Sequence, residues 1–144
     1  MNDTSPLTFP RSLVNRILHL AQQHPEREVC GLIGSRDGRP VSCYPVSNVA
    51  EQADVRFQLD GAEQIAAMRE MRDRGEQLFA IFHSHPTAPA EPSPTDLANA
   101  AYPDALHLIV SLGTAGVLEL RGFRFTGAGR GYTEVPLGLT ESTG

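Results

Sequence analysis

The segment LFAIFHSHPTAPAEPSPTD, residues 78–96, constrains the fold and the chemistry of this chain more than any other. Its apolar start is short and predicts a buried strand. The strand ends in His83 and His85, and side chains two residues apart on a strand point to the same face. A proline-rich loop follows and leads to a helix start, with Ser93 as the predicted N-cap and Pro94 at the first helical position. The segment therefore predicts a strand, a stiff loop and a helix that turns back toward the two imidazoles.

Two imidazoles on one face of a strand can bind the same metal ion, each through a ring nitrogen at ~2.0–2.1 Å. Asp96, in the first turn of the predicted helix, adds a carboxylate whose ionised form the helix dipole favours. Three such ligands and an open position for water are typical of catalytic zinc. A histidine pair alone is more often structural, and SPTD alone is simply a helix start. Their occurrence together within fourteen residues favours Zn²⁺ bound by His83, His85 and Asp96.

The rest of the sequence mixes helices and strands without strict alternation of the two. Asp60, with Glu63 three residues later, predicts a capping box at a helix start. The order of elements predicts an α+β fold, in which a mixed, mostly antiparallel sheet is flanked by helices. Outside residues 78–96, predicted helices cover 10–24 and 60–75, and predicted strands cover 28–34, 41–48, 55–60, 106–112, 117–125 and an edge strand at 133–137.

Length and composition limit the possible classes of protein. A chain of 144 residues is expected to form a single domain over 1–144, with a disordered tail from about 138. The chain opens without an apolar signal core, and no segment approaches the ~20 apolar residues of a membrane span. We therefore expect a cytoplasmic protein without a membrane partner. The net charge of −5 argues against a nucleic-acid partner, and the sequence does not indicate an oligomeric state.

The pattern H-S-H-P-x6-S-x-x-D over residues 83–96 resembles the signature of the JAMM (MPN+ or JAB) metallopeptidases. The stretches EVCGLIG, AIFHSHP and AAYPDALHLIVSL are similar to the small bacterial members, so the resemblance covers most of residues 10–125. It implies a single JAMM/MPN+ domain with a cytidine-deaminase-like architecture. It also implies a zinc metallopeptidase that hydrolyses peptide or isopeptide bonds.

The resemblance assigns a role to each residue of the signature. It implies that His83, His85 and Asp96 hold the zinc ion, that Glu28 is the general base, and that Ser93 donates a hydrogen bond to the developing oxyanion. The first three assignments agree with the ligand chemistry inferred from the residues themselves. The assignment of Glu28 depends on the resemblance alone.

Other titratable residues near the start of the chain leave alternatives open. From composition alone, Glu26 and Glu28 are equally good candidates for solvated turn residues. Cys30 is expected to share a strand face with Glu28, where a buried structural thiol is favoured over a ligand or nucleophile. A disulfide between Cys30 and Cys43 stays open, although reduced thiols are favoured. We expect structural roles for the histidines outside the signature, which are His19, His24 and His107.

The resemblance also implies a class of substrate. JAMM enzymes cleave at the C-terminal glycines of ubiquitin or ubiquitin-like proteins, and small bacterial members process sulfur carriers of that fold. The short chain favours such a carrier over polyubiquitin. Two alternatives are a non-catalytic MPN-type scaffold, against which the intact signature argues, and a domain with a DNA-linked role, which the acidic balance disfavours. Nucleobase deamination would need an HxE motif together with PCxxC, and the sequence lacks PCxxC.

Overall fold

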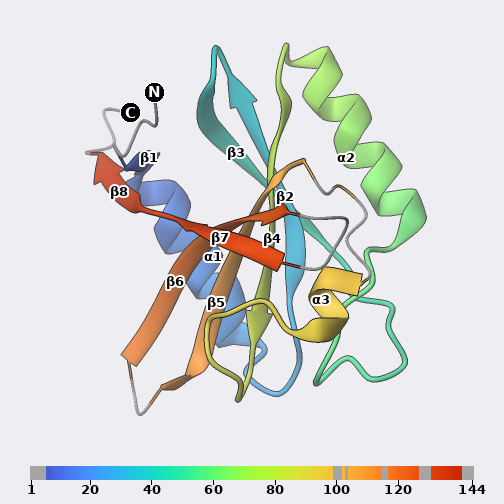
Figure 1. The fold of residues 1–144 in the computed structure, drawn as a ribbon. Helices are drawn as coiled ribbons and strands as arrows, with labels where there is room; N and C mark the ends of the chain where they lie inside the picture. The colour runs from blue at the N-terminus through green and yellow to red at the C-terminus, as the bar shows by residue number, and fades with distance from the viewer. Residues whose placement is uncertain (1–5, 99–101, 103, 115–116, 127–130, 141–144) are drawn as a thin grey trace.

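A central six-stranded sheet organises the computed structural model, which describes residues 6–98, 102, 104–114, 117–126 and 131–140 (Figure 1). Its strand order is β3-β2-β4-β5-β6-β7, and only the β4–β5 pair is parallel. The predicted mixed, mostly antiparallel sheet is confirmed. The elements are β1 (Leu7–Pro10), α1 (Arg11–Gln23), β2 (Cys30–Arg36), β3 (Arg39–Val46), α2 (Gly61–Asp73), β4 (Gln77–His85), α3 (Pro94–Ala98), β5 (Leu106–Thr114), β6 (Val117–Thr126), β7 (Gly131–Val135) and β8 (Leu137–Thr140).

Helix α1 covers one face of the sheet. Its apolar residues recur at helical spacing, and Leu13, Val14, Ile17 and Ala21 are buried. They belong to a core cluster that also contains Phe82 and other residues of β2, β4 and β5. Burial of such aliphatic side chains stabilises the fold by roughly 1.5–3 kcal/mol each. The face that α1 covers is therefore the packed structural face of the sheet.

Helices α2 and α3 lie on the opposite face (Figure 1). Met71 of α2 packs with Leu32 and Ile81, whose side chains alternate along β2 and β4 with those that face α1. In α2, Asp60 accepts the predicted capping bond from the Glu63 N–H, but the Glu63 carboxylate accepts from Ser47 N–H instead of completing the capping box. Thus α2 is tied at its first turn to the end of β3.

The predicted strand at 55–60 is wrong. This stretch is a turn and an extended loop, with one isolated β-bridge between Asn48 and Leu59. The Asn48 side chain accepts hydrogen bonds from the N–H groups of Ala50 and Gln58 and donates to the carbonyl of Arg56. A side chain thereby satisfies backbone groups that a neighbouring strand would otherwise pair.

The predicted disorder from about 138 is wrong for residues 138–140, which belong to β8. This strand pairs in parallel with β1, so that Leu7 lies opposite Leu137 and Pro10 opposite Thr140. The partner lies at the other end of the chain, and local composition gives no sign of it. Residues 141–144 fall outside the described part. In the described part of the chain, no helix is long and apolar enough to cross a membrane.

Candidate metal centre

Four buried titratable side chains meet at the C-terminal end of β4. His83 and His85 come from the strand itself, Asp96 from α3, and Glu28 from the turn before β2. One ligand atom of each lies within 4.8 Å of one ligand atom of every other. The structure therefore brings a residue 55 positions upstream of His83 into the same site as the sequence-local triad.

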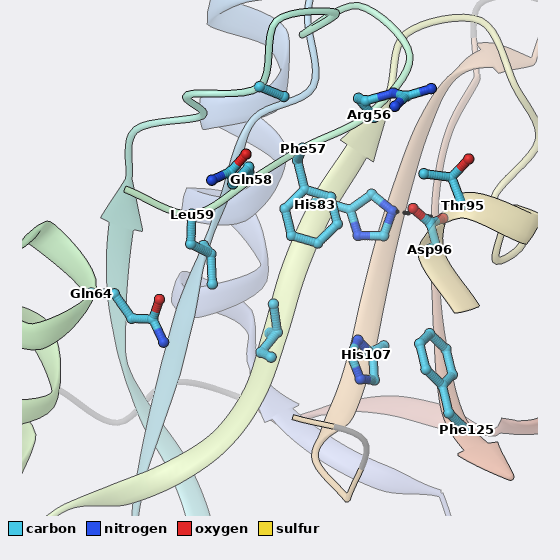
Figure 2. A pocket seen from close by; sticks show the side chains of 12 residues that line it. Arg56, Phe57, Gln58, Leu59, Gln64, His83, Thr95, Asp96, His107 and Phe125 are labelled. Carbon is cyan, nitrogen blue, oxygen red and sulfur yellow. Dashed lines mark hydrogen bonds and ion pairs between the residues drawn. The ribbon is translucent and has the colours of Figure 1, made fainter. Parts of the chain in front are cut away.

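The three donors from the HSHP…SPTD segment form a nearly regular triangle. His83 Nε2 lies 3.1 Å from His85 Nε2, and Asp96 Oδ2 lies 3.1 Å from His83 Nε2 and 3.2 Å from His85 Nε2. Zinc bonds of ~2.0–2.1 Å in tetrahedral geometry place ligand atoms roughly 3.3–3.4 Å apart. The observed spacing fits one small metal ion bound at three corners. Figure 2 shows the His83 ring facing Asp96.

His85 is fixed by the loop that follows it. Its Nδ1 lies 2.8 Å from the carbonyl oxygen of Pro89, which selects the tautomer with the proton on Nδ1 and leaves Nε2 free to bind a metal. The loop is held in turn by the Ser111 hydroxyl, which donates to the Ala88 carbonyl at 2.7 Å. A Cβ on Gly113 would lie 2.3 Å from the Thr87 carbonyl oxygen, so the close approach of the loop to β5 requires glycine there.

Asp96 and Ser93 bond reciprocally at the start of α3. The Ser93 N–H donates to Asp96 Oδ2 at 2.9 Å, and the Asp96 N–H donates to Ser93 Oγ at 3.0 Å. Ser93 is therefore the N-cap that the sequence predicts, and it also orients the third candidate ligand. Burial acts to raise the pKa of Asp96, but hydrogen bonds from His83 and His85 outweigh burial and hold it well below its usual range.

The two histidines differ in their electrostatics. Burial lowers the pKa of His83 even though Asp96 opposes this, which favours the neutral imidazole that binds metals. Burial also acts to lower the pKa of His85, but the contacts with Asp96 and the Pro89 carbonyl outweigh it and leave the pKa raised. Asp96 thus serves as an anionic partner to both rings.

Glu28 is buried among these groups. Burial raises its pKa to about 8, with a further contribution from Asp96 and an opposing one from His85. Its Oε1 has no hydrogen-bond partner within the described residues. Such an atom is costly to bury, and a nearby cation or bound water would satisfy it. The neighbouring Glu26 has a side chain that is 69% exposed, so the structure places only Glu28 in the site.

The backbone around Glu28 is held by residues that sequence reasoning missed. Ser84 lies between the two histidines in sequence and bonds to the segment just before β2. The Val29 N–H donates to Ser84 Oγ at 2.8 Å, and the Ser84 N–H donates to the Val29 carbonyl at 3.0 Å. The Asn48 amide donates to the Glu28 carbonyl at 3.0 Å. Only the presence of a serine in HSH and of an asparagine at a strand end hinted at these roles.

Cys30 lies opposite His83 in the register of β2 and β4, whereas Glu28, which was expected on the same strand, precedes β2. Its thiol donates to the Val46 carbonyl at 3.3 Å, and burial raises its pKa to about 12. It is therefore a buried thiol with little nucleophilic character. Cys30 and Cys43 are both free, so the open alternative of a disulfide between them is wrong.

A cavity of about 430 Å³ adjoins the donors and extends from His83 and Asp96 toward β6 (Figure 2). Phe57 stacks on the His83 ring at 4.4 Å between centroids, and His107 stacks on Phe125 at 3.9 Å. Burial lowers the pKa of His107 to about 4, so the ring is neutral near pH 7. His107 thus serves as a packed, uncharged wall, which agrees with its expected structural role.

The sequence matches the model of a known family. The family model described as prokaryotic homologs of the JAB domain matches residues 10–124, and the chain belongs to that family. The CysO-cysteine peptidase of Mycobacterium tuberculosis is 35% identical over 138 residues, which cover 94% of this chain and 92% of that protein. A desampylase of Haloferax volcanii is 34% identical over 102 residues, covering 69% of this chain and 73% of that protein.

Solved structures agree with this placement. The solution structure of DSY2949 from Desulfitobacterium hafniense has a TM-score of 0.83 and 32% identity, and the match covers 94% of this chain and 93% of that one. A JAMM structure described as a metalloprotease-like zinc site in the proteasome and signalosome has a TM-score of 0.59 and 18% identity, covers 95% of this chain and 100% of that one, and shows the shared fold. The protein is thus a hydrolase of the JAMM type with a site suited to a metal ion.

Proposed function

We propose that this protein is a zinc-dependent peptidase that hydrolyses the bond at or beyond the C-terminal Gly-Gly of a ubiquitin-like sulfur-carrier protein. The observation that carries the proposal is the meeting of Glu28 with the His83, His85 and Asp96 donors in one buried site. The relative from M. tuberculosis is named for a CysO-cysteine substrate, and the one from H. volcanii is named a desampylase. These names support a small-protein conjugate as substrate over an unrelated peptide.

Each side chain of the site has a distinct role in this proposal. His83, His85 and Asp96 hold the ion, and their neutral-imidazole and carboxylate chemistry suits zinc. When bound, zinc supplies Lewis acidity and makes water nucleophilic near neutral pH. Glu28 accepts a proton from the attacking water and delivers it to the departing amine. The Ser93 hydroxyl, whose oxygen already accepts from the Asp96 N–H, donates a hydrogen bond to the developing oxyanion.

The unsatisfied Oε1 of Glu28 supports its role as base. A structural carboxylate would have its oxygens satisfied by the protein, whereas a base must leave one oxygen open to water. The raised pKa has the direction expected of a group that must both take up and release a proton near neutral pH. The complete site favours an enzyme over the non-catalytic scaffold.

Zinc content and carrier processing together test the proposal. We expect about one zinc per chain by elemental analysis after purification without chelators, or after reconstitution. We also expect the mass of a ubiquitin-like carrier extended beyond its Gly-Gly to fall by the mass of the extension. A protein that binds no zinc in either preparation would contradict the metal assignment, and an unchanged carrier mass with zinc-loaded protein would contradict the substrate assignment.

The cellular context of this proposal is the cytoplasm. The free state of Cys30 and Cys43 fits a reducing compartment, where small carrier proteins are processed as soluble substrates. We retain the single JAMM/MPN+ domain over residues 1–144 as part of the proposal.

A further inference from the structure

The cavity beside the metal centre has one cationic wall residue. Its surface includes the apolar side chains of Phe57, Leu59 and Phe125, which suit an uncharged segment of substrate. Of the described residues that line it, Arg56 alone carries a permanent positive charge, because the pKa of the lining His107 is lowered to about 4. Arg56 extends from the loop at the edge of the cavity where His83 and Asp96 lie (Figure 2).

The Arg56 guanidinium has no hydrogen-bond or ion-pair partner within the described part of the chain. Other arginines have such partners: Arg121 pairs with Glu134, and Arg27 donates to the Asn48 carbonyl. The backbone of Arg56 is nevertheless fixed at both polar groups. Its N–H donates to the Gln52 carbonyl at 3.1 Å, and its own carbonyl accepts from the Asn48 amide at 3.0 Å.

Asn48 connects this arginine to the candidate base. The same side-chain amide nitrogen donates to the carbonyls of Glu28 and Arg56, each at 3.0 Å. The position of the Arg56 backbone relative to Glu28 is therefore set by two bonds to one group. The guanidinium itself stays exposed and available to an acceptor that enters the cavity.

We propose that Arg56 binds the free α-carboxylate of a single residue that leaves from the C-terminus of the substrate. This inference rests on the proposed function and narrows its substrate class. In an amino acid, the amide nitrogen and the carboxylate carbon are only about 2.5 Å apart, so a one-residue extension places its carboxylate beside the metal centre. Each further residue moves the carboxylate away by up to ~3.3–3.6 Å.

A carboxylate is the ligand that an unpaired guanidinium recognises best, since two parallel N–H groups match its two oxygens. In an isopeptide, the leaving group is a lysine side chain, which carries no carboxylate close to the cleaved bond. Arg56 therefore makes the enzyme select linear, one-residue C-terminal extensions over isopeptide conjugates. Arg56 is a specificity-determining residue in this proposal and takes no part in the proton transfers.

Two carriers that differ in a single group test the proposal. Both end in Gly-Gly-Cys, one as the free acid and the other as the C-terminal amide. Zinc-loaded protein should cleave the acid ~10–100-fold more efficiently in kcat/KM, the range for a hydrogen bond to a charged group. Arg56→Gln should reduce the acid-to-amide ratio to about one, mainly by slowing cleavage of the acid. Arg56→Lys should keep part of the preference, and Arg39→Gln, which changes an exposed arginine at the opposite end of the sheet, should keep all of it.

Binding to zinc-loaded Glu28→Gln protein, measured by calorimetry with the same two carriers, gives a second readout that needs no turnover. Equal rates and affinities for acid and amide would overturn the role of Arg56 and leave the peptidase proposal standing. An acid preference that persists in Arg56→Gln would also overturn it, because the metal ion would then be the carboxylate's partner. Failure to bind or cleave either carrier would overturn the peptidase proposal and this inference with it.

Discussion

Two glutamates are buried on the α2 side of the sheet, one near each end of β4, and they differ in how their oxygens are satisfied. Glu76, just before β4, is 6% exposed; its Oε1 accepts from the Tyr44 hydroxyl at 2.7 Å and its Oε2 from the Ser42 hydroxyl at 2.9 Å. Arg36 adds an ion-pair contact at 3.5 Å. Glu28, beyond the other end of the strand, is 3% exposed, and its Oε1 has no partner in the described residues.

The difference fits a structural role for Glu76 and the proposed catalytic role of Glu28. The fold accommodates Glu76 closely: a Cβ on Gly34 would lie 2.4 Å from Glu76 Oε1, so glycine at that position makes room for the acid. Glu28 instead lies close to two imidazoles and a second carboxylate. Burial alone does not distinguish the two residues, whereas hydrogen-bond satisfaction does.

The largest expected effect is the loss of turnover in Glu28→Gln. The amide keeps the shape of the side chain but cannot accept the proton, so the rate should fall by about 10²–10⁴-fold. Zinc content and the unfolding midpoint should stay near those of the natural protein. Glu76→Gln is the matched control and should keep turnover within a few-fold. Full activity in Glu28→Gln would remove the distinction between the two glutamates.

Asp96→Ala should mainly affect the metal. It removes one of three proposed protein ligands, so zinc affinity should fall by more than ~100-fold, beyond the 10–100-fold typical of groups that only support ligands. Competition with a chromogenic chelator measures this affinity. Asp73→Ala, at the exposed end of α2, serves as the control. An unchanged affinity in Asp96→Ala would show that Asp96 is not a ligand.

Glu76→Gln should lower the free energy of unfolding, whereas Glu28→Gln should leave it unchanged. The two hydroxyl donors lose a charged acceptor, and the free energy of unfolding should fall by about 1–3 kcal/mol. Urea denaturation measures the change, and Glu70→Gln on the exposed side of α2 should stay within about 0.5 kcal/mol. If Glu76→Gln were neutral and Glu28→Gln strongly destabilising, the structural role assigned to Glu76 would belong to Glu28 instead.

A smaller effect concerns the pH dependence of stability through His107, which lies opposite Ile81 midway between the two glutamates. Its pKa is about 4 when folded and about 6.5 when unfolded, so below pH 6.5 the unfolded chain binds the extra proton. Stability is therefore lost as pH falls, by about 1 kcal/mol from this group at pH 5.5.

Chelator-treated His107→Phe protein should lack this part of the pH dependence, because phenylalanine can stack on Phe125 without titrating. Chemical denaturation at a series of pH values measures it, and His19→Gln on the exposed side of α1 is the control. An identical pH slope in the natural protein and His107→Phe would contradict the pKa assigned to the buried ring.

Short-range patterns were sufficient to predict the centre of the site. Two histidines on one strand face and a capped helix start lie within fourteen residues, and backbone geometry alone determines where such neighbours can point. The same local reasoning wrongly predicted a strand at residues 55–60. Alternating polarity there suggested a strand, but it could not reveal that the Asn48 side chain would satisfy the backbone of that loop.

The sequence by itself predicted the candidate donors, the mixed sheet and most of the element order, because these follow from local periodicity and from the ligand preferences of the side chains. Only the tertiary structure decided that Glu28 enters the site while Glu26 stays in solvent. It also decided that residues 137–140 pair with β1 and that Arg56 lines the cavity beside the metal site. These outcomes depend on contacts between distant segments, such as the 55-residue separation bridged by Ser84 and Val29, and local patterns carry no information about such contacts.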